Sequence, residues 1–408
     1  MAEMAGMSGE QTVVVRINQD YCSRCSICYS ICPYEAIERD AETGKVEIDI
    51  QKCQVCGICY SACPVFAIEI VYYDYDSLVG YVEGELKRTG AETLVLMCRG
   101  NSPSTREVGE ILSEQGLSVK DYIPLRLPCS GRVPTEFIFR VLGFGIKNVV
   151  SIQCEDFFCR FKEGTKINTR RLFLGRRVLE ELGFSKDSVR VVKYSRKAVY
   201  DTTKCVGCDK CVFICPYAAI EAEAFATPKI LSEYCMGCGA CALVCPHHAI
   251  QVKGFEFESV LKRYGDSAFR LKAEGKSPVI LVFCCQWSEF SALDDPEGVF
   301  FKRNAVTLEV PCFKALDPVH VVNALRNGFD GVMAVVCSAE DCKLQEGRDT
   351  AERNMAVLRD VLKKMGLIDR FELYEASPRD AGKFEEKLEA FVRKVAALPP
   401  IKPLKKEA

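Results

Sequence analysis

The chain has 408 residues, of which 48% are hydrophobic and 27% charged. At roughly 100–200 residues per domain, this length allows two to four domains, each large enough to bury a core. The 54 basic and 56 acidic residues leave a formal net charge of −2, which argues against a general nucleic-acid binder. Most unusual are the 25 cysteines. Because no signal-like segment and no apolar run of about 20 residues occurs, we expect a cytoplasmic protein without a transmembrane segment, whose cysteines hold metal.

Four stretches of the sequence share the spacing C-x2-C-x2-C-x3-C followed by proline. This spacing is typical of bacterial-type ferredoxins, which bind pairs of [4Fe–4S] clusters. Three closely spaced cysteines hold one cluster, and the fourth reaches across to its neighbour. We therefore expect a first outer set of Cys22, Cys25, Cys28 and Cys63, a first inner set of Cys53, Cys56, Cys59 and Cys32, a second outer set of Cys205, Cys208, Cys211 and Cys245, and a second inner set of Cys235, Cys238, Cys241 and Cys215.

Zinc is the alternative metal for these runs. Structural zinc sites pair C-x2-C units across a spacer and have no need of the third cysteine or of the Cys-Pro step, so four complete copies favour iron–sulfur clusters. Small residues between the ligands allow backbone amides to approach the sulfides; they are Gly57, Gly207, Gly237 and Gly239. His247 and His248 follow the last run, where we expect surface positions and not metal ligands.

Between and after these runs, strands and helices are predicted in alternation. Hydrophobic periodicity and capping residues predict strands at 93–97, 122–127, 148–152 and 188–192, with helices at 106–115, 134–142 and 168–182. The second half predicts strands at 279–283, 305–310, 331–336 and 371–374, with helices at 318–327, 350–365 and 382–397. Alternation of this kind predicts a doubly wound parallel sheet in each half.

Matching cysteines recur about 183 residues apart, as in Cys22 and Cys205 or Cys129 and Cys312, which indicates a tandem duplication. The expected fold is thus α/β plus α+β. Dicluster ferredoxin domains at 12–75 and 196–255 alternate with parallel-sheet iron–sulfur domains at 76–195 and 256–400.

Nine cysteines lie outside the ferredoxin runs. Eight of them either follow the end of a predicted strand directly or lie a few residues further along the chain. Ligands of such sheets bind beyond the carboxyl ends of the strands, so we expect two further metal sites. The first sheet set is Cys98, Cys129, Cys154 and Cys159, and the second sheet set is Cys285, Cys312, Cys337 and Cys342. Zinc ligation or plain burial are the alternatives. Cys284 is left over as a core thiol.

Two segments resemble the delta subunit of methyl-viologen-reducing hydrogenase. They are Leu127-Pro128-Cys129-Ser130-Gly131-Arg132-Val133-Pro134 continuing to Cys154 and Cys159, and Gly328 through Cys337, Cys342 and Gly347. The resemblance implies an α/β module that carries a [2Fe–2S] cluster and passes electrons from a hydrogenase or formate dehydrogenase to the flavoprotein subunit of heterodisulfide reductase. It brings the expected cofactors to four [4Fe–4S] and two [2Fe–2S] clusters.

The sequence departs from this family at several positions. The family usually has C-x-W-C at the first ligand site, whereas this chain has Cys285-Gln286-Trp287-Ser288 in the second half and Asn101 at the matching position of the first. Four cysteines per sheet domain remain. The second half also reads Cys312-Phe313-Lys314-Ala315 in place of the Cys-Ser-Gly-Arg signature, so its site departs further from the family pattern.

No residue pattern indicates catalysis by this chain itself. Its three histidines include His320, which we interpret as structural, and no G-x-G-x-x-G follows a predicted strand. We therefore expect an electron-transfer subunit between an oxidoreductase partner and a flavoprotein or heterodisulfide-reductase-type partner. A catalytic disulfide or quinone reductase that uses the Cys284-Cys285 pair is the alternative, and purely structural clusters are a third. Trp287, beside a ligand, fits a partner surface or the core equally well.

Overall fold

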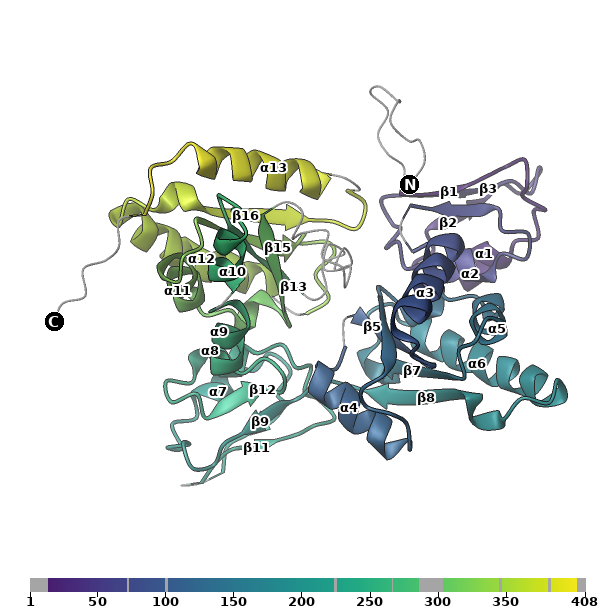
Figure 1. The fold of residues 1–408 in the computed structure, drawn as a ribbon, viewed down its shortest axis with the longest axis horizontal. Coiled ribbons are helices and arrows are strands. Elements are labelled where there is room, and N and C mark those ends of the chain that lie inside the picture. Colours follow the sequence, from purple (N-terminus) through teal and green to yellow (C-terminus); the bar gives the residue numbers. More distant parts are fainter. Residues whose placement is uncertain are drawn as a thin grey trace.

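The computed structural model describes residues 14–71, 73–99, 102–223, 226–265, 267–285, 304–344, 347–380 and 383–401. The two halves of the chain lie side by side, the first in purple to teal and the second in green to yellow (Figure 1). Each half joins a small cysteine-rich domain to a larger sheet domain. The two halves run in opposite directions, so the small domains lie at opposite ends of the molecule (Figure 1).

Each small domain is built from two antiparallel strand pairs and two short helices. In the first, β1 (Val15–Ile17) pairs with β4 (Ile68–Ile70), and β2 (Ile37–Arg39) pairs with β3 (Val46–Ile48). In the second, β9 (Ala198–Tyr200) pairs with β12 (Ile250–Val252), and β10 (Ile220–Glu221) pairs with β11 (Lys229–Ile230). The helices are α1 (Ile27–Ile31), α2 (Ile58–Ala62), α7 (Lys210–Ile214) and α8 (Ala240–Val244).

The proline that follows each cysteine run explains why these helices are short. A residue before proline is forced out of the helical region by its clash with the ring. Accordingly, Cys32 after α1 and Cys63 after α2 are extended, with ψ of 114° in both. Each ligand run therefore ends in a turn that brings the chain back across the domain.

The two larger domains contain four-stranded, wholly parallel sheets with the same strand order. The first sheet runs β6 (Tyr122–Leu127), β5 (Thr93–Cys98), β7 (Asn148–Cys154) and β8 (Val189–Tyr194). The second runs β14 (Ala305–Val310), β13 (Ile280–Cys285), β15 (Gly331–Cys337) and β16 (Phe371–Ala376). The predicted parallel α/β sheets are confirmed.

Helices cover both faces of each sheet. Leu94 and Leu96 of β5 share a buried cluster with α3 (Tyr75–Thr89), α5 (Thr135–Gly143) and α6 (Gly164–Glu181), whereas Val95 and Met97 face α4 (Thr105–Glu114). In the second half, one face packs against α9 (Phe257–Gly265), α10 (Ser267–Ala273), α11 (Pro318–Arg326) and α12 (Gly347–Lys364), and the other against α13 (Lys383–Ala396). Because both faces are buried, the central strands are mostly apolar, and exceptions such as Ser151 and Gln153 of β7 are buried polar residues.

The predicted elements differ from the structure mainly at helix starts. Helix α6 begins at Gly164 and not at 168, and α12 begins at Gly347 and not at 350. The prediction also lacked α3, α9 and α10. Asp74 caps α3 by accepting a hydrogen bond from the Ser77 amide, a start signal that the sequence does carry.

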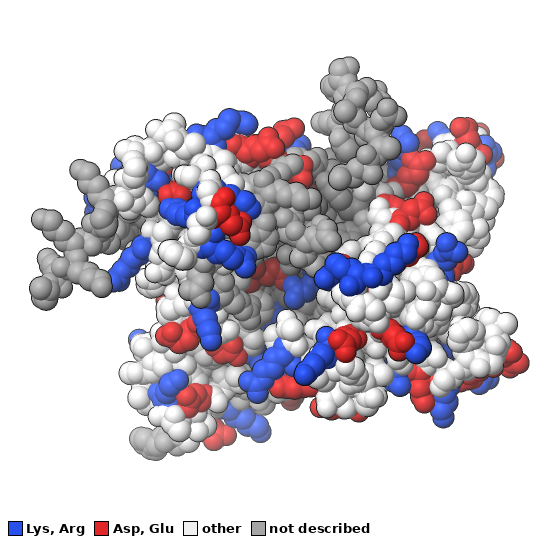
Figure 2. Space-filling view, in the orientation of Figure 1, with Lys and Arg blue, Asp and Glu red and all other residues white. Residues whose placement is uncertain are grey.

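Some predicted features fall outside the described residues. Asn101 and the segment that contains Gln286, Trp287 and Ser288 are among them. In the part of the chain that the structure describes, no helix combines the length and apolar character needed to cross a membrane. Acidic and basic side chains are interspersed over the face drawn in Figure 2.

Candidate metal centres

The first outer set brings together cysteines from both runs of its domain. Burial raises the pKa of the Cys28 thiol, and the nearby thiols of Cys22, Cys25 and Cys63 raise it further by repulsion between thiolates. Cys63 belongs to the other run. The fourth cysteine of one run therefore lies beside the first three of its partner, as cross-ligation requires.

The first inner set shows the reciprocal arrangement. Burial raises the pKa of Cys59 strongly, with further contributions from Cys56, Cys53 and Cys32. Burial also raises the pKa of Cys56 to about 12. Cys32 lies at the end of the other run, so the two predicted sets exchange their fourth cysteines in space.

The second small domain repeats both arrangements. Cys241 of the second inner set is buried, and its pKa is raised by burial and by Cys238, Cys235 and Cys215. In the second outer set, burial raises the pKa of Cys211, and the nearby thiol of Cys245 also raises it. Each domain thus gathers eight thiols into two adjacent groups of four.

Backbone amides point at the sulfurs in the turn that follows each Cys-Pro step. The amide nitrogens of Ala36, Ala67, Ala219 and Ala249 donate to the Sγ atoms of Cys32, Cys63, Cys215 and Cys245 at 3.2–3.4 Å. Such donors stabilise thiolate over thiol. They are also the hydrogen bonds that tune the potentials of iron–sulfur clusters. The surroundings of these sulfurs therefore fit thiolate ligands of a cluster.

The loops between ligands need left-handed backbone. Gly57 and Gly239 precede α2 and α8 with φ of 78° and 85°, a region that glycine enters without strain. At the matching positions Ser26 and Asp209 adopt the same conformation. Two of the four loops therefore use glycine for this conformation and two reach it without glycine; the approach of amides to the sulfides, the role predicted for the loop glycines, stays a prediction.

The first sheet set converges at the carboxyl end of its sheet. Cys98 is the last residue of β5 and Cys154 the last of β7, and their thiols are hydrogen-bonded. The Sγ of Cys98 also lies 3.0 Å from Ser130 Oγ and accepts from the Ser130 amide at 3.3 Å. These hydrogen bonds lower the pKa of Cys98 to about 6.

The remaining thiols of this set meet at the start of α6. A Cβ on Gly164 would lie 2.4 Å from the Sγ of Cys129 and 3.7 Å from that of Cys159. Burial raises the pKa of the Cys129 thiol, and the nearby thiols of Cys98 and Cys159 raise it further. All four predicted ligands are thus brought together, and Gly164 leaves room for their sulfurs.

The second sheet set converges in the same way. The Sγ atoms of Cys285 and Cys337 are 3.5 Å apart, and Cys312 is hydrogen-bonded to Cys285. A Cβ on Gly347 would lie 3.0 Å from the Sγ of Cys342 and 3.1 Å from that of Cys312. Gly347 therefore occupies the place that Gly164 has in the first half.

Cys284 lies apart from this set. Its side chain is fully buried on the opposite face of β13, in the cluster that contains Phe384 and Phe391. Cys285 instead belongs to the cluster on the other face. The two adjacent cysteines therefore do not face one site.

Each inner set lies against the sheet set of its own half. Cys56 and Cys129 share a buried cluster with Ile58 and Phe161, and the thiol of Cys56 is close enough to add to the rise that burial causes in the pKa of Cys129. In the second half, Cys238 and Cys312 occupy one buried cluster. The sequence did not predict this adjacency, because the two cysteines of each pair are more than 70 residues apart.

One histidine, His247, lines a pocket together with Cys205, Cys208, Cys211 and Cys245 of the second outer set. His247 and His248 are exposed, and His248 stacks on Phe257 with ring centroids 4.6 Å apart. His320 is buried, and burial lowers its pKa to about 4. Among the described residues, no three His, Cys, Asp or Glu side chains form a group that would hold a single metal ion.

Family models match most of the chain. The model of the methyl-viologen-reducing hydrogenase delta subunit matches residues 104–207 and 280–399. Models of 4Fe-4S dicluster domains match residues 14–64 and 198–252. The first delta-subunit match begins after Cys98, whereas the second includes Cys285.

Among curated proteins, the chain is similar to components of two kinds of enzyme complex. It is 29% identical over 204 residues to a subunit of the ferredoxin/F(420)H(2)-dependent CoB-CoM heterodisulfide reductase of Methanosarcina acetivorans, which covers 49% of this chain and 25% of that protein. It is 28% identical over 131 residues to the corresponding subunit of the ferredoxin:CoB-CoM heterodisulfide reductase of Methanosarcina mazei, covering 31% of this chain and 16% of that protein. The chain thus spans a quarter or less of these two relatives.

The second kind is a hydrogenase component. The iron-sulfur subunit of the F420-non-reducing hydrogenase of Archaeoglobus profundus is 29% identical over 133 residues, covering 32% of this chain and 97% of that protein. The two delta-subunit matches together take up more than half of the chain. This protein therefore belongs to the family of the methyl-viologen-reducing hydrogenase delta subunit, here joined to 4Fe-4S dicluster domains.

Proposed function

We propose that this chain is a cytoplasmic, multi-cluster electron-transfer subunit of an oxidoreductase complex. It would relay electrons between a hydrogenase, formate dehydrogenase or similar partner and a flavoprotein or heterodisulfide-reductase-type partner. The observation that carries the proposal is the contiguity of the cysteine sets. In each half an outer set adjoins an inner set, and the inner set adjoins a sheet set through Cys56 and Cys129 or through Cys238 and Cys312.

The chain is organised, in this proposal, as a tandem duplication with ferredoxin domains at 12–75 and 196–255 and delta-subunit-like domains at 76–195 and 256–400. Identical strand orders in the two sheets support it. Gly164 and Gly347, which match under the same repeat, each lie against two cysteine sulfurs. A repeated packing requirement of this kind is expected when both copies keep the same type of site.

The ligand assignment follows from the thiol neighbours. The outer and inner sets would each hold a [4Fe–4S] cluster, and each sheet set would hold a [2Fe–2S] cluster through its four thiolates. When bound, such clusters supply one-electron oxidation and reduction. The chain itself supplies thiolates, amide donors and the exclusion of water. Cys129 and Cys312 are almost fully buried, at 2% and 3% exposure.

The outer sets are the places where a partner would make contact. Cys25 and Cys208 are exposed, unlike the other cysteines of the described chain. Beside them lie exposed apolar side chains, Tyr21 and Tyr29 near the first and Val206 and Phe213 near the second. Exposed apolar groups next to a redox site are typical of protein–protein contact surfaces.

The catalytic alternative receives less support. A disulfide or quinone reductase built on the Cys284-Cys285 pair would need both thiols at one site. Their side chains instead enter opposite faces of the second sheet.

Anaerobic purification followed by a spectroscopic redox titration tests the proposed function. We expect several one-electron centres, no bound flavin and no zinc. Zinc in place of iron would make the sites structural, and bound flavin with disulfide reduction by the chain alone would favour the catalytic alternative.

Cross-ligation has its own test. We expect Cys32→Ser to disturb the centre of the first inner set, because Cys32 lies with Cys53, Cys56 and Cys59. The matched variant Cys63→Ser should disturb the first outer set. Loss confined to the centre of Cys22, Cys25 and Cys28 in the Cys32 variant would contradict the assignment.

A further inference from the structure

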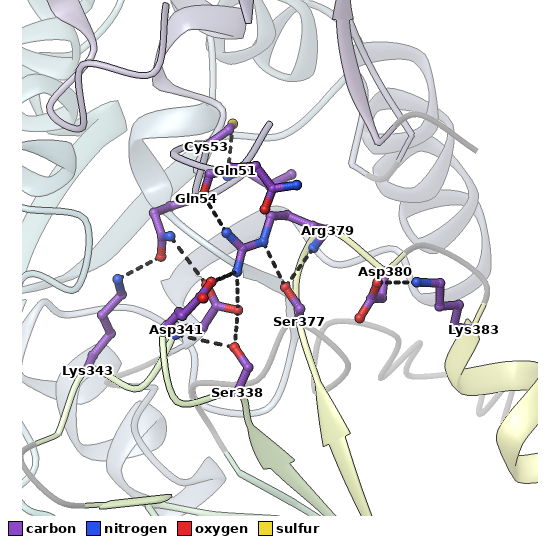
Figure 3. A network of polar contacts seen from close by, with 12 residues as sticks. Gln51, Cys53, Gln54, Ser338, Asp341, Lys343, Ser377, Arg379, Asp380 and Lys383 are labelled. Carbon is purple, nitrogen blue, oxygen red and sulfur yellow. Dashed lines mark hydrogen bonds and ion pairs between the residues drawn. The ribbon is translucent and has the colours of Figure 1, made fainter. Parts of the chain in front are cut away.

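Two loops that carry predicted ligands in different halves are joined directly. Gln54 lies between Cys53 and Cys56 of the first inner set, and its side chain faces the loop that carries Cys337 and Cys342 of the second sheet set (Figure 3). We propose that this contact, centred on Gln54 and Lys343, is a redox junction at which the two halves exchange electrons and influence each other's potential. The inference rests on the proposed function.

The junction is held by hydrogen bonds at both ends of the Gln54 amide. Its Nε2 donates to Asp341 Oδ1 at 3.3 Å, and its Oε1 accepts from Lys343 Nζ at 2.7 Å. Asp341 and Lys343 are the immediate neighbours of Cys342. A single glutamine side chain thus bridges the backbone next to Cys53 and the backbone next to Cys342.

Arg379 fixes the junction from the other side (Figure 3). It donates to the carbonyl oxygen of Gln51 at 2.6 Å and to both carboxylate oxygens of Asp341 at 3.1–3.2 Å. Gln54 and Asp341 are only 8% and 1% exposed. Buried polar groups with full hydrogen bonding keep a fixed arrangement, so the spacing between the two ligand loops is defined.

Lys343 places a positive charge between the two sets. Burial lowers its pKa, and the groups that act on it include the thiol of Cys337 and the cations Arg160 and Lys162. Its Nζ also lies 5.4 Å from the ring centroid of Tyr34. Burial raises the pKa of Tyr34, and the nearby thiols of Cys56 and Cys129 raise it further. Because water screens a partly buried charge poorly, Lys343 should stabilise the reduced form at both neighbouring sets.

The opposite junction has a different construction. Lys197 Nζ donates to the carbonyl oxygen of Cys235 at 3.2 Å and lies 3.6 Å from the ring centroid of Phe158. Phe158 belongs to the loop between Cys154 and Cys159 of the first sheet set. Each inner set therefore adjoins its own sheet set and is linked through intervening side chains to the loop of the other half's sheet set, so these contacts connect the two inner and two sheet sets in a closed ring.

The ring gives an electron two routes between the halves. At the junction one electron leaves the centre of the first inner set and one arrives at the second sheet set, or the reverse. No bond forms or breaks, and no proton is required. Oxidation at one set accompanies reduction at the other, so the exchange needs no further reactant.

A redox titration of the full chain and its Lys343→Met variant tests the junction. The variant removes the charge and keeps most of the apolar stem, so the reduction potentials of both the first inner set and the second sheet set should fall. We expect about a tenfold change in each redox equilibrium, which is about 59 mV for a one-electron couple. Variants Cys59→Ser and Cys337→Ser identify which spectroscopic signals belong to the two sets.

The controls separate charge from packing. Lys343→Arg should restore both potentials, and Lys383→Met, which removes an exposed lysine paired with Asp380 nearby (Figure 3), should change neither. Gln54→Met keeps the positive charge of Lys343 but removes both hydrogen bonds of the Gln54 side chain. We expect it to slow electron exchange between the two halves. This variant tests the junction if Lys343→Met binds less iron than the parent chain. A shift at only one set, or at neither, in a fully loaded variant overturns the junction. A parent chain without a redox centre at Cys337 instead refutes the proposed function at that site.

Discussion

The two sheet domains share a scaffold but surround their cysteines differently. In the first, Ser130 directs both its amide and its hydroxyl at Cys98. The matching residue of the second is Phe313, which is buried and apolar. Strand order and the glycine at the start of the long helix stay the same, whereas the side-chain hydroxyl beside the first sulfur is replaced by an apolar ring. Because such hydrogen bonds tune cluster potentials, the two copies should differ in potential more than in geometry.

The residues that lie between each inner set and its sheet set also differ between the two halves. Arg132 is buried and donates to the carbonyl oxygen of Val55, next to Cys56. The matching residue Ala315 packs directly against Gly239, which precedes α8. A Cβ added to Gly239 would lie 2.3 Å from the Cβ of Ala315. A cation therefore lies near both sets in each half: Arg132 in the first, and in the second the buried Lys314, which acts on the thiols of both Cys238 and Cys312.

A difference between the halves also explains how they recognise each other. Arg126 and Glu309 occupy matching positions in β6 and β14, and they form an ion pair at 3.2 Å. In a symmetric pair of identical copies these positions would carry like charges, which repel. The complementary charges therefore favour pairing of one half with the other over pairing of two identical halves.

The largest effect should come from filling the space beside the sulfurs. Gly164→Ala would place its Cβ 2.4 Å from Cys129 Sγ, and Gly347→Ala would place its Cβ 3.0 Å from Cys342 Sγ. We expect loss of the first sheet site in the former and a partial loss of the second in the latter, measured by iron per chain. Gly175→Ala, whose nearest contact is 3.4 Å, is the control in α6. Full iron in Gly164→Ala would contradict the packing argument.

Removing the buried cation should destabilise only the first half. Arg132→Ala leaves the carbonyl oxygen of Val55 without this donor and creates a cavity, which together should cost about 3 kcal/mol of unfolding free energy. Denaturant unfolding under anaerobic conditions measures it, with exposed Arg170→Ala as the control. Equal stabilities of the two variants would show that the polar contact is dispensable.

Acid should destabilise the second half through His320. The folded-state pKa of about 4 lies below the usual 6.5 because burial disfavours the cation, with Asp317 opposing and His248 adding to the shift. The unfolded chain therefore binds the extra proton, and stability falls as the pH drops from about 6.5 to 4, by at most about 3 kcal/mol.

The first half offers the control, because its matching residue is the buried Phe137. We expect His320→Phe to flatten this pH dependence when unfolding midpoints are compared between pH 7 and pH 5. An unchanged slope would assign the acid sensitivity to other groups.

The smallest effect should follow from deleting one hydroxyl. Ser130→Ala removes a hydrogen-bond donor near Cys98 and should lower the potential of the first sheet site, by up to about tenfold in the redox equilibrium or about 59 mV. The second sheet site, which has Phe313 at this position, serves as an internal control. A shift of both sites would point to a global change.

Local patterns in the sequence predicted the strands well, and the grouping of the cysteines agrees with the spacing of the runs, for identifiable reasons. Runs such as 122–127 and 305–310 are mostly apolar, with buried residues at alternate positions, and their limits coincide with β6 and β14. The four ligand runs have a fixed spacing that few other sites use. By contrast, α6 and α12 start earlier than predicted, at Gly164 and Gly347, where the lack of a side chain leaves room for the cysteine sulfurs.

Contacts between distant segments were beyond local patterns. Gln54 and Asp341 are separated by 287 residues, and the motifs in which they lie fix the positions of cysteines without indicating that these two side chains meet. The adjacency of Cys56 and Cys129 likewise depends on how one domain rests on another. Such arrangements follow from tertiary packing, which residue spacing alone does not determine.

The central claim is that both sheet domains, and not only the ferredoxin domains, hold redox centres. Mössbauer spectroscopy with iron, sulfide and zinc analysis of the anaerobically purified full chain tests it most directly. The account predicts about 20 iron atoms per chain, about 16 in [4Fe–4S] and about 4 in [2Fe–2S] centres, with no zinc. A fully loaded chain with only about 16 iron atoms, all in [4Fe–4S] centres, would contradict it.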